Sequence, residues 1–322
     1  MEIAEIDLSL SVPAFLLKSG IPRDHELWQR CDAMLHKLQS SPLPVFLHRG
    51  MSKDDFPENS DTIKAPRNAP PPELIGSCFL LDLKGNPYLV TAAHVYDERK
   101  SGLVTISGQN TTYYPIDMFR GEYHLTRSEK IDRSDDKADF GFAMLPQAIV
   151  ELLKKRNSRF ISIEECLQTP AQNTHYAFTG FPAHWGKPNH GTKMIETAGI
   201  VYATRIKLDE QAEYGLNEWN FVLDLKSPAK MDTGQPLRDV KLPGISGAPV
   251  FTLPSVEEFM NGSSVNYVAG MSTERVGKGN QPQKDGLAVT FISAILSAII
   301  SSNEVLMLQP PNSGLIQVIR PS

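Results

Sequence analysis

Two short motifs carry side chains that together could perform nucleophilic catalysis. One is a strand-like run that ends in two alanines followed by His94, and the other flanks Ser246 with Gly244 and Gly247. A histidine can take the proton of a serine hydroxyl, and flanking glycines let backbone N–H groups converge as an oxyanion hole requires. Each motif is weak alone, because histidines are common elsewhere and Gly–Ser turns dominate ordinary loops. Together they predict a serine nucleophile with a histidine base.

A carboxylate that could orient the imidazole lies between the two motifs. Asp139 stands at the start of the apolar run 140–145, where a strand could bury it against the histidine. Three rival aspartates lie just upstream, in a charged run typical of a solvated loop: Asp132, Asp135 and Asp136. We therefore predict Asp139 as the third member of the group.

The motifs resemble those of the trypsin-like (chymotrypsin-fold) serine peptidases, over about residues 74–300. Residues 91–94 match the family's Thr-Ala-Ala-His, residues 244–249 match its Gly-x-Ser-Gly-x-Pro, and the histidine precedes the serine as in the family. The resemblance implies a mostly β fold of two antiparallel six-stranded β-barrels. It also implies His94, Asp139 and Ser246 as the catalytic triad, with the backbone N–H groups of Gly244 and Ser246 as the oxyanion hole.

Other segments are similar to family strands, and some positions depart from the family. Residues 76–79 resemble the family's strand before the hairpin that carries the catalytic histidine, and residues 176–182 resemble an early strand of the family's second barrel. Residues 268–272 resemble the strand that pairs with substrate, which implies three substrate-binding residues: Gly270, Met271 and Ser272. The best-known members have aspartate where Ile245 stands, together with an Ile-Val-Gly-Gly activation sequence that this chain lacks. The chain is therefore more similar to stand-alone intracellular members, and Asp239 and Val240, near the specificity position, do not decide its P1 preference.

Periodicity predicts the elements that position these residues. Apolar residues at helical spacing predict an amphipathic helix over 24–39 with Asp24 as its N-cap, a helix near 147–156 and a C-terminal helix over 291–300. Many short apolar runs between turns predict strands. We expect four regions: a helical N-terminal extension (1–70), a first barrel with His94 and Asp139 (71–157), a second barrel with Ser246 and the C-terminal helix (158–303), and a frayed tail (304–322).

Composition limits the classes of function. The 322 residues are 41% hydrophobic with a formal net charge of −5, which argues against a nucleic-acid partner. We find no apolar run long enough for a membrane helix, and no clustered zinc ligands, because His184 and His190 have no cysteine partner. Three widely spaced cysteines argue against a disulfide framework: Cys31, Cys78 and Cys166. We expect a cytoplasmic protein that needs no cofactor or metal.

The function expected from these residues is a serine endopeptidase that cleaves protein or peptide substrates through a covalent acyl-enzyme. The alternative is a latent or catalytically inactive trypsin-like domain that acts as a protein-binding or regulatory module. Residues 1–70 could cover the cleft or dock a regulatory protein. We favour the simpler interpretation, in which they only pack on the first barrel.

Overall fold

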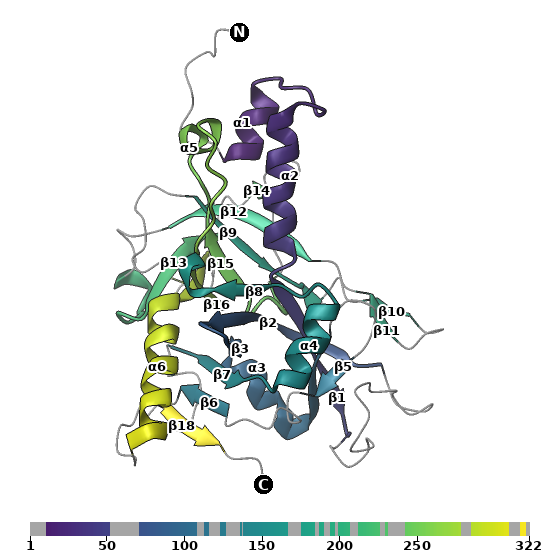
Figure 1. Ribbon diagram of the computed structural model, residues 1–322, viewed down its shortest axis with the longest axis vertical. Helices are drawn as coiled ribbons and strands as arrows, with labels where there is room; N and C mark the ends of the chain where they lie inside the picture. The colour runs from purple at the N-terminus through teal and green to yellow at the C-terminus, as the bar shows by residue number, and fades with distance from the viewer. Residues whose placement is uncertain are drawn as a thin grey trace.

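The computed structural model describes most of the chain (Figure 1). Described residues are 11–51, 71–107, 113–115, 123–126, 136, 138–166, 175–183, 187–189, 194–196, 199–206, 212–225, 229–230, 242–277, 285–308 and 316–319. Among these, only the backbone is described for 107, 113–115, 123–125, 187–189, 194–196, 229–230, 303–308 and 316–319.

The first of two large sheets has nine strands in the described residues, in the order β18-β6-β7-β3-β2-β1-β4-β5, with β8 parallel to β2. Its strands are β1 (Pro42–Arg49), β2 (Glu73–Leu83), β3 (Asn86–Ala92), β4 (Gly102–Ser107), β5 (Tyr113–Pro115), β6 (Tyr123–Thr126), β7 (Phe140–Met144), β8 (Phe160–Ser162) and β18 (Ile316–Ile319). Apart from the β2–β8 pair, neighbouring strands run antiparallel. In β2, Phe79, Leu80 and Leu81 are all fully buried, so both faces of this strand are covered.

The second sheet follows the order β13-β17-β16-β15-β9-β12-β14 and is antiparallel throughout. Its strands are β9 (His175–Gly180), β12 (Ile200–Arg205), β13 (Asn220–Asp224), β14 (Ala229–Lys230), β15 (Pro249–Thr252), β16 (Val268–Val276) and β17 (Gly286–Phe291). A bridge between Ile206, after β12, and Leu223 of β13 brings the two ends of a six-stranded set together. A separate hairpin pairs β10 (Lys187–Asn189) with β11 (Met194–Glu196).

Two curled antiparallel sheets confirm the predicted chymotrypsin-like class, although the strand count of the first differs from the expected six. The first sheet is larger because β1, β8 and β18 join it. Strand β1 lies between β2 and β4, so the first barrel includes residues that were expected to belong to the extension 1–70. Similarly, residues expected to form a frayed tail continue helix α6 (Ile292–Leu308) and form β18.

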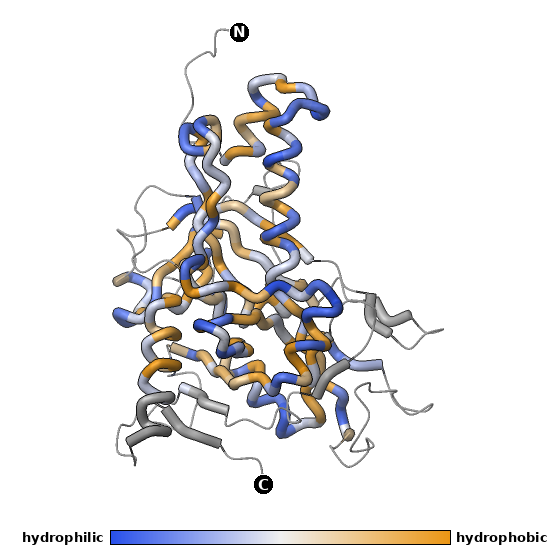
Figure 2. The backbone as a smooth tube through the Cα atoms, viewed as in Figure 1, coloured by the Kyte–Doolittle hydropathy of each residue, from blue (hydrophilic) through white to orange (hydrophobic). Residues whose placement is uncertain are grey.

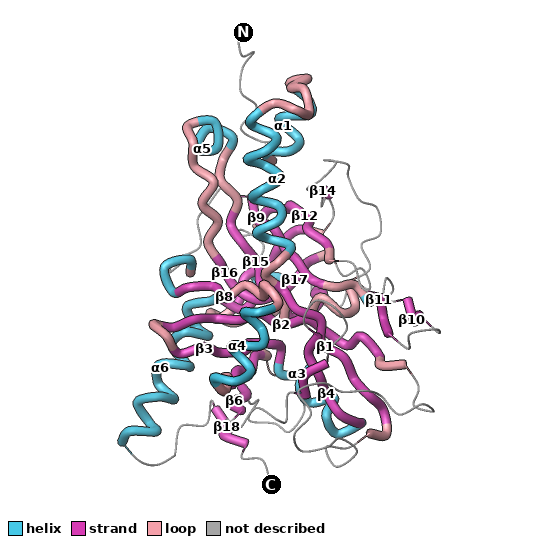
Figure 3. Tube along the Cα trace, turned by 45° about the vertical axis from the view of Figure 1, so that its right-hand side comes forward, coloured by secondary structure: helices cyan, strands magenta, loops and turns pink. Residues whose placement is uncertain are grey.

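The N-terminal helices pack mainly on elements of the second barrel rather than the first (Figures 1 and 3), and the C-terminal end of the second helix also reaches the first sheet, where Lys37 Nζ lies 2.7 Å from Glu165 Oε1, just after β8. Helix α1 (Val12–Lys18) contacts α5 (Val256–Met260), and α2 (Glu26–Gln39) contacts β9 and β12. The predicted stripe of α2 is buried, and Arg30 Nη2 donates to the Phe259 carbonyl oxygen at 2.6 Å. The N-cap is His25 rather than the predicted Asp24, because the His25 ring accepts from the Leu27 N–H at 3.1 Å.

Many strand residues in the middle of the molecule are hydrophobic, drawn orange in Figure 2, and buried apolar side chains of both sheets form the core. The remaining helices are α3 (Ala93–Asp97), α4 (Gln147–Lys155) and the 3-10 turns η2 (Glu98–Ser101) and η5 (Ile163–Glu165).

All three cysteines are free and buried, as predicted, and burial raises the pKa of Cys31 and of Cys166 to about 12. No helix among the described residues is long and apolar enough to cross a membrane.

His48 is expected to make stability fall in mild acid. It lies in β1, only 2% exposed, with Nε2 3.1 Å from Thr105 Oγ1, and burial lowers its pKa from 6.5 to about 4. The unfolded chain therefore takes up this proton at a higher pH than the folded chain, so protonation favours unfolding as pH falls from about 6.5 to 4. The free energy of unfolding should drop by about 3 kcal/mol across that window from this residue.

Urea unfolding at pH 7 and pH 4.5 would measure this contribution. The pH-dependent loss should be smaller in His48→Gln than in the parent, whatever the absolute stability of the variant. His36→Gln, at an exposed position of α2, should keep the parent's dependence. If the parent and His48→Gln lost the same unfolding free energy between pH 7 and pH 4.5, His48 would not be the source of the pH dependence.

Candidate active site

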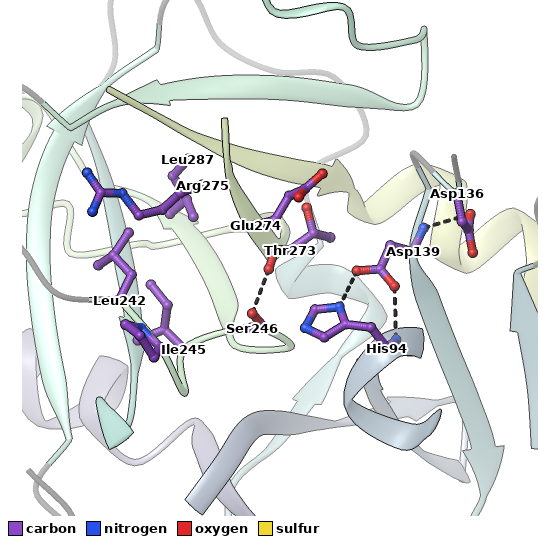
Figure 4. Close-up of a pocket in the computed structure, with 11 residues that line it drawn as sticks. His94, Asp136, Asp139, Leu242, Ile245, Ser246, Thr273, Glu274, Arg275 and Leu287 are labelled. Atoms are coloured by element: carbon purple, nitrogen blue, oxygen red, sulfur yellow. Dashed lines mark hydrogen bonds and ion pairs between the residues drawn. The ribbon is translucent and has the colours of Figure 1, made fainter. Parts of the chain in front are cut away.

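A cavity of about 480 Å³ lies where elements of the two barrels meet (Figure 4). The first barrel contributes His94 of α3 and Asp139, which immediately precedes β7. The second barrel contributes residues of the loop before β15 and of the end of β16. Eleven residues line the cavity: His94, Asp136, Asp139, Leu242, Pro243, Ile245, Ser246, Thr273, Glu274, Arg275 and Leu287. The three predicted catalytic side chains are therefore brought to one place from segments far apart in the chain.

His94 is held by Asp139 through two hydrogen bonds. His94 Nδ1 donates to Asp139 Oδ2 at 2.6 Å, and the His94 backbone N–H donates to Asp139 Oδ1 at 3.0 Å. The Ala93 N–H donates to the Asp139 carbonyl oxygen at 3.1 Å, so Asp139 also satisfies N–H groups in the first turn of α3. The Asp139 side chain is 11% exposed, whereas that of His94 is 40% exposed. This arrangement shields the carboxylate and leaves the imidazole open to the cavity.

Asp136 lines the cavity, although the sequence offered it only as a rival to Asp139. The charged run around it predicted a solvated loop, but Asp136 is buried, and its Oδ1 accepts from the Asp139 backbone N–H at 3.1 Å. Asp139 itself has φ +40°, in the left-handed region that non-glycine residues rarely occupy. No local sequence signal distinguishes Asp136 from the other aspartates of that charged run. Asp132 and Asp135 lie outside the described residues.

The loop that carries Ser246 is fixed by both barrels. From the first barrel, the Ser77 N–H donates to the Ser246 carbonyl oxygen at 2.8 Å, and Ser77 Oγ donates to the Gly244 carbonyl oxygen at 2.8 Å. From the second, Ser272 Oγ donates to the Ile245 carbonyl oxygen at 2.7 Å. Positive φ at Gly244 (+95°) and Gly247 (+89°) permits this tight turn.

The backbone N–H groups of the two predicted oxyanion-hole residues, Gly244 and Ser246, could each donate a hydrogen bond to a substrate. Among the described residues, none accepts a hydrogen bond from the backbone N–H of Gly244 or of Ser246. Ser246 is half-buried and lines the cavity, whereas Gly244 is buried between two residues that line it, Pro243 and Ile245. Two such amides near a serine hydroxyl could bind a developing oxyanion, and this role of Gly244 and Ser246 stays a prediction.

The hydroxyl of Ser246 is engaged away from His94. Its Oγ donates to the Thr273 carbonyl oxygen at 2.6 Å (Figure 4). Since a hydroxyl has one proton, this bond occupies the proton that a general base would remove. Figure 4 shows the His94 ring between Asp139 and Ser246, so rotation about the Ser246 Cα–Cβ bond is the step that would bring the hydroxyl to the imidazole.

The predicted substrate-binding residues lie on the expected strand but inside the sheet. Met271 pairs with Pro249 on one side and Thr290 on the other, and both Met271 and Ser272 are fully buried. The cavity is instead lined by the next residues of β16, Thr273 to Arg275, where the register with β17 shifts. This bulge lies where β16 reaches the cavity, and sequence alone did not indicate it. Asp239, Val240, His184 and His190 lie outside the described residues.

In the part of the chain that the structure describes, no group of three histidine, cysteine, aspartate or glutamate side chains is arranged to hold a metal ion.

The two curled antiparallel sheets, with His94, Asp139 and Ser246 in a cavity between them, define a chymotrypsin-fold protein. No family model and no curated protein matches the sequence. Among solved structures, the chain is similar to an inactivated protease paralogue of the scabies mite, S-I1, with 11% identity and a TM-score of 0.44, covering 86% of this chain and 98% of that one. It is also similar to the active form of the Rv3671c protease of M. tuberculosis, with 12% identity and a TM-score of 0.40, covering 87% of each chain.

Proposed function

We propose that the chain is a serine endopeptidase that hydrolyses protein or peptide substrates. The observation that carries the proposal is the His94–Asp139 pair in one cavity with Ser246. A module that only binds protein has no need for an imidazole fixed by a shielded carboxylate beside a serine. The three free thiols suit a reducing compartment, and we propose the cytoplasm.

The proposed mechanism uses only groups of the chain. Ser246 Oγ leaves the Thr273 carbonyl oxygen and attacks the scissile carbonyl carbon, while His94 Nε2 takes the hydroxyl proton. Asp139 fixes the ring through Nδ1 and stabilises the imidazolium that forms. The Gly244 and Ser246 N–H groups bind the oxyanion, each contributing about 3 kcal/mol to barrier lowering. His94 then protonates the leaving amine, and water releases the acyl group from Ser246.

The Ser246–Thr273 hydrogen bond favours a second candidate, a latent form of the same enzyme. In that form the serine stays bonded to Thr273 until substrate or a partner protein turns it toward His94. The N-terminal helices do not line the cavity, so they are not a lid over it.

Labelling with a fluorophosphonate probe would test the proposal without a known substrate. The folded parent should be labelled on the peptide that contains Ser246. Ser246→Ala and a heat-unfolded sample of the parent should remain unlabelled, because the reaction needs both the nucleophile and its folded surroundings. Absence of labelling in a folded parent, even with peptide added, would overturn the proposal of an active enzyme.

A further inference from the structure

Three consecutive residues around the proposed catalytic aspartate each form a hydrogen bond with a side chain, one from the same segment and two from other strands. Asp136 Oδ1 accepts from the Asp139 N–H at 3.1 Å. Thr126 Oγ1, at the end of β6, accepts from the N–H of Phe140 at 2.9 Å. Thr290 Oγ1, from β17 in the second barrel, donates to the Ala138 carbonyl oxygen at 2.6 Å.

Asp136 joins two of these supports. Its second oxygen, Oδ2, accepts from Thr126 Oγ1 at 2.8 Å, so one carboxylate links the Asp139 backbone to the threonine that holds Phe140. Asp136 and Thr126 are 8% and 5% exposed, which keeps water from replacing these bonds.

The supports matter because the Asp139 backbone is in an unfavourable conformation. Its φ of +40° is tolerated only when surrounding contacts hold it. A hydrogen bond from its N–H to a buried carboxylate is one such contact, and a charged acceptor makes it stronger than a neutral one. If φ relaxed, the Asp139 side chain would turn, and its two bonds to His94 would lengthen together.

We propose that Asp136 is a positioning residue, which holds Asp139 in the conformation that directs its carboxylate to His94. The effect on catalysis rests on the proposed function, whereas the effect on the His94–Asp139 pair does not. Asp136 acts through Asp139, so it should change the turnover rate much more than substrate affinity.

Four variants separate positioning from simple structural support. Asp136→Ala removes both acceptors, whereas Asp136→Asn keeps one carbonyl oxygen for the Asp139 N–H. Asp139→Asn marks full loss of the carboxylate at His94. Asp285→Ala is a matched control, because Asp285 is also 8% exposed and bonded at 2.7 Å to the Tyr214 hydroxyl but does not line the cavity.

NMR titration of the His94 ring gives a measurement that needs no activity. A nearby carboxylate favours protonated imidazole, so the midpoint of the His94 titration should fall further in Asp136→Ala than in Asp136→Asn, toward its value in Asp139→Asn. The charges of Glu274, Arg275 and Asp136, which line the same cavity, also influence the protonation of the ring. Asp136→Asn and Asp136→Ala both remove the Asp136 charge, so the difference between these two variants reports the lost hydrogen bond alone. Asp285→Ala should leave the midpoint unchanged.

The rate of fluorophosphonate labelling gives the second readout. We expect a 10- to 100-fold decrease in Asp136→Ala, with most of the rate restored in Asp136→Asn. An unchanged His94 midpoint in folded Asp136→Ala, or equal loss in both Asp136 variants, would overturn the positioning role. If the parent is not labelled but the midpoint moves as expected, the positioning role stands and the proposed function fails.

Discussion

Replacing His94 with alanine is expected to lower the rate of peptide hydrolysis by about 10⁵- to 10⁶-fold. In the proposed mechanism the imidazole takes the proton from Ser246 and later gives it to the leaving amine, and no other described histidine lines the cavity. Removing one member of a catalytic triad costs nearly as much as removing all of them. The residual rate should come from substrate binding and the Gly244 and Ser246 N–H groups, which the substitution does not touch.

Steady-state kinetics with a cleavable peptide would measure this loss. The double variant His94→Ala/Ser246→Ala should be no slower than His94→Ala alone, because the two residues act as a unit. His36→Ala, exposed on α2, is the matched histidine control and should behave like the parent. Independent, multiplying losses from His94 and Ser246 would show that they do not share one mechanism.

Replacing Gly247 with alanine is expected to cost about 3–5 kcal/mol of unfolding free energy, from overpacking together with left-handed strain. A Cβ at this position would lie 2.0 Å from the Ser77 carbonyl oxygen and 2.6 Å from Thr91 Oγ1. Both contacts belong to the first barrel, in the strands that precede His94, so the loop must move away from them. Ser246 would move with it, and fluorophosphonate labelling should fall as well.

Gly85→Ala separates the clash from the strain of positive φ. Gly85 lies in the turn between β2 and β3 with φ +90°, close to the +89° of Gly247, but a Cβ there meets nothing within 4 Å. Its substitution should therefore cost only about 1–2 kcal/mol and leave labelling intact. Urea unfolding of both variants gives the comparison, and similar losses at the two positions would mean that the Ser77 contact does not limit the loop.

Local sequence patterns are enough to predict several parts of the molecule. The histidine and serine motifs are short, contiguous and built from small residues that a tight turn requires. The order of residues alone is therefore enough to predict His94 as a base and Ser246 as a nucleophile. The stripe of α2 and the β2–β3 hairpin follow from periodicity and from the Lys84–Gly85–Asn86 turn, which involve neighbours in the chain. The same patterns predict many strands and hence a mostly β fold.

Tertiary structure decided everything that depends on pairing between distant segments. Strand β1 carries an ordinary apolar run, and only its hydrogen bonds to β2 and β4 make it part of the first barrel. Asp136 has the sequence surroundings of a solvated loop, yet burial beside Thr126 turns it into a support for Asp139. The bulge in β16 places Thr273 to Arg275 at the cavity instead of the residues before them. The sequence thus determined which side chains could react, because their turns are local, while burial and register, set by strands far apart in the chain, decided which residues surround and orient them.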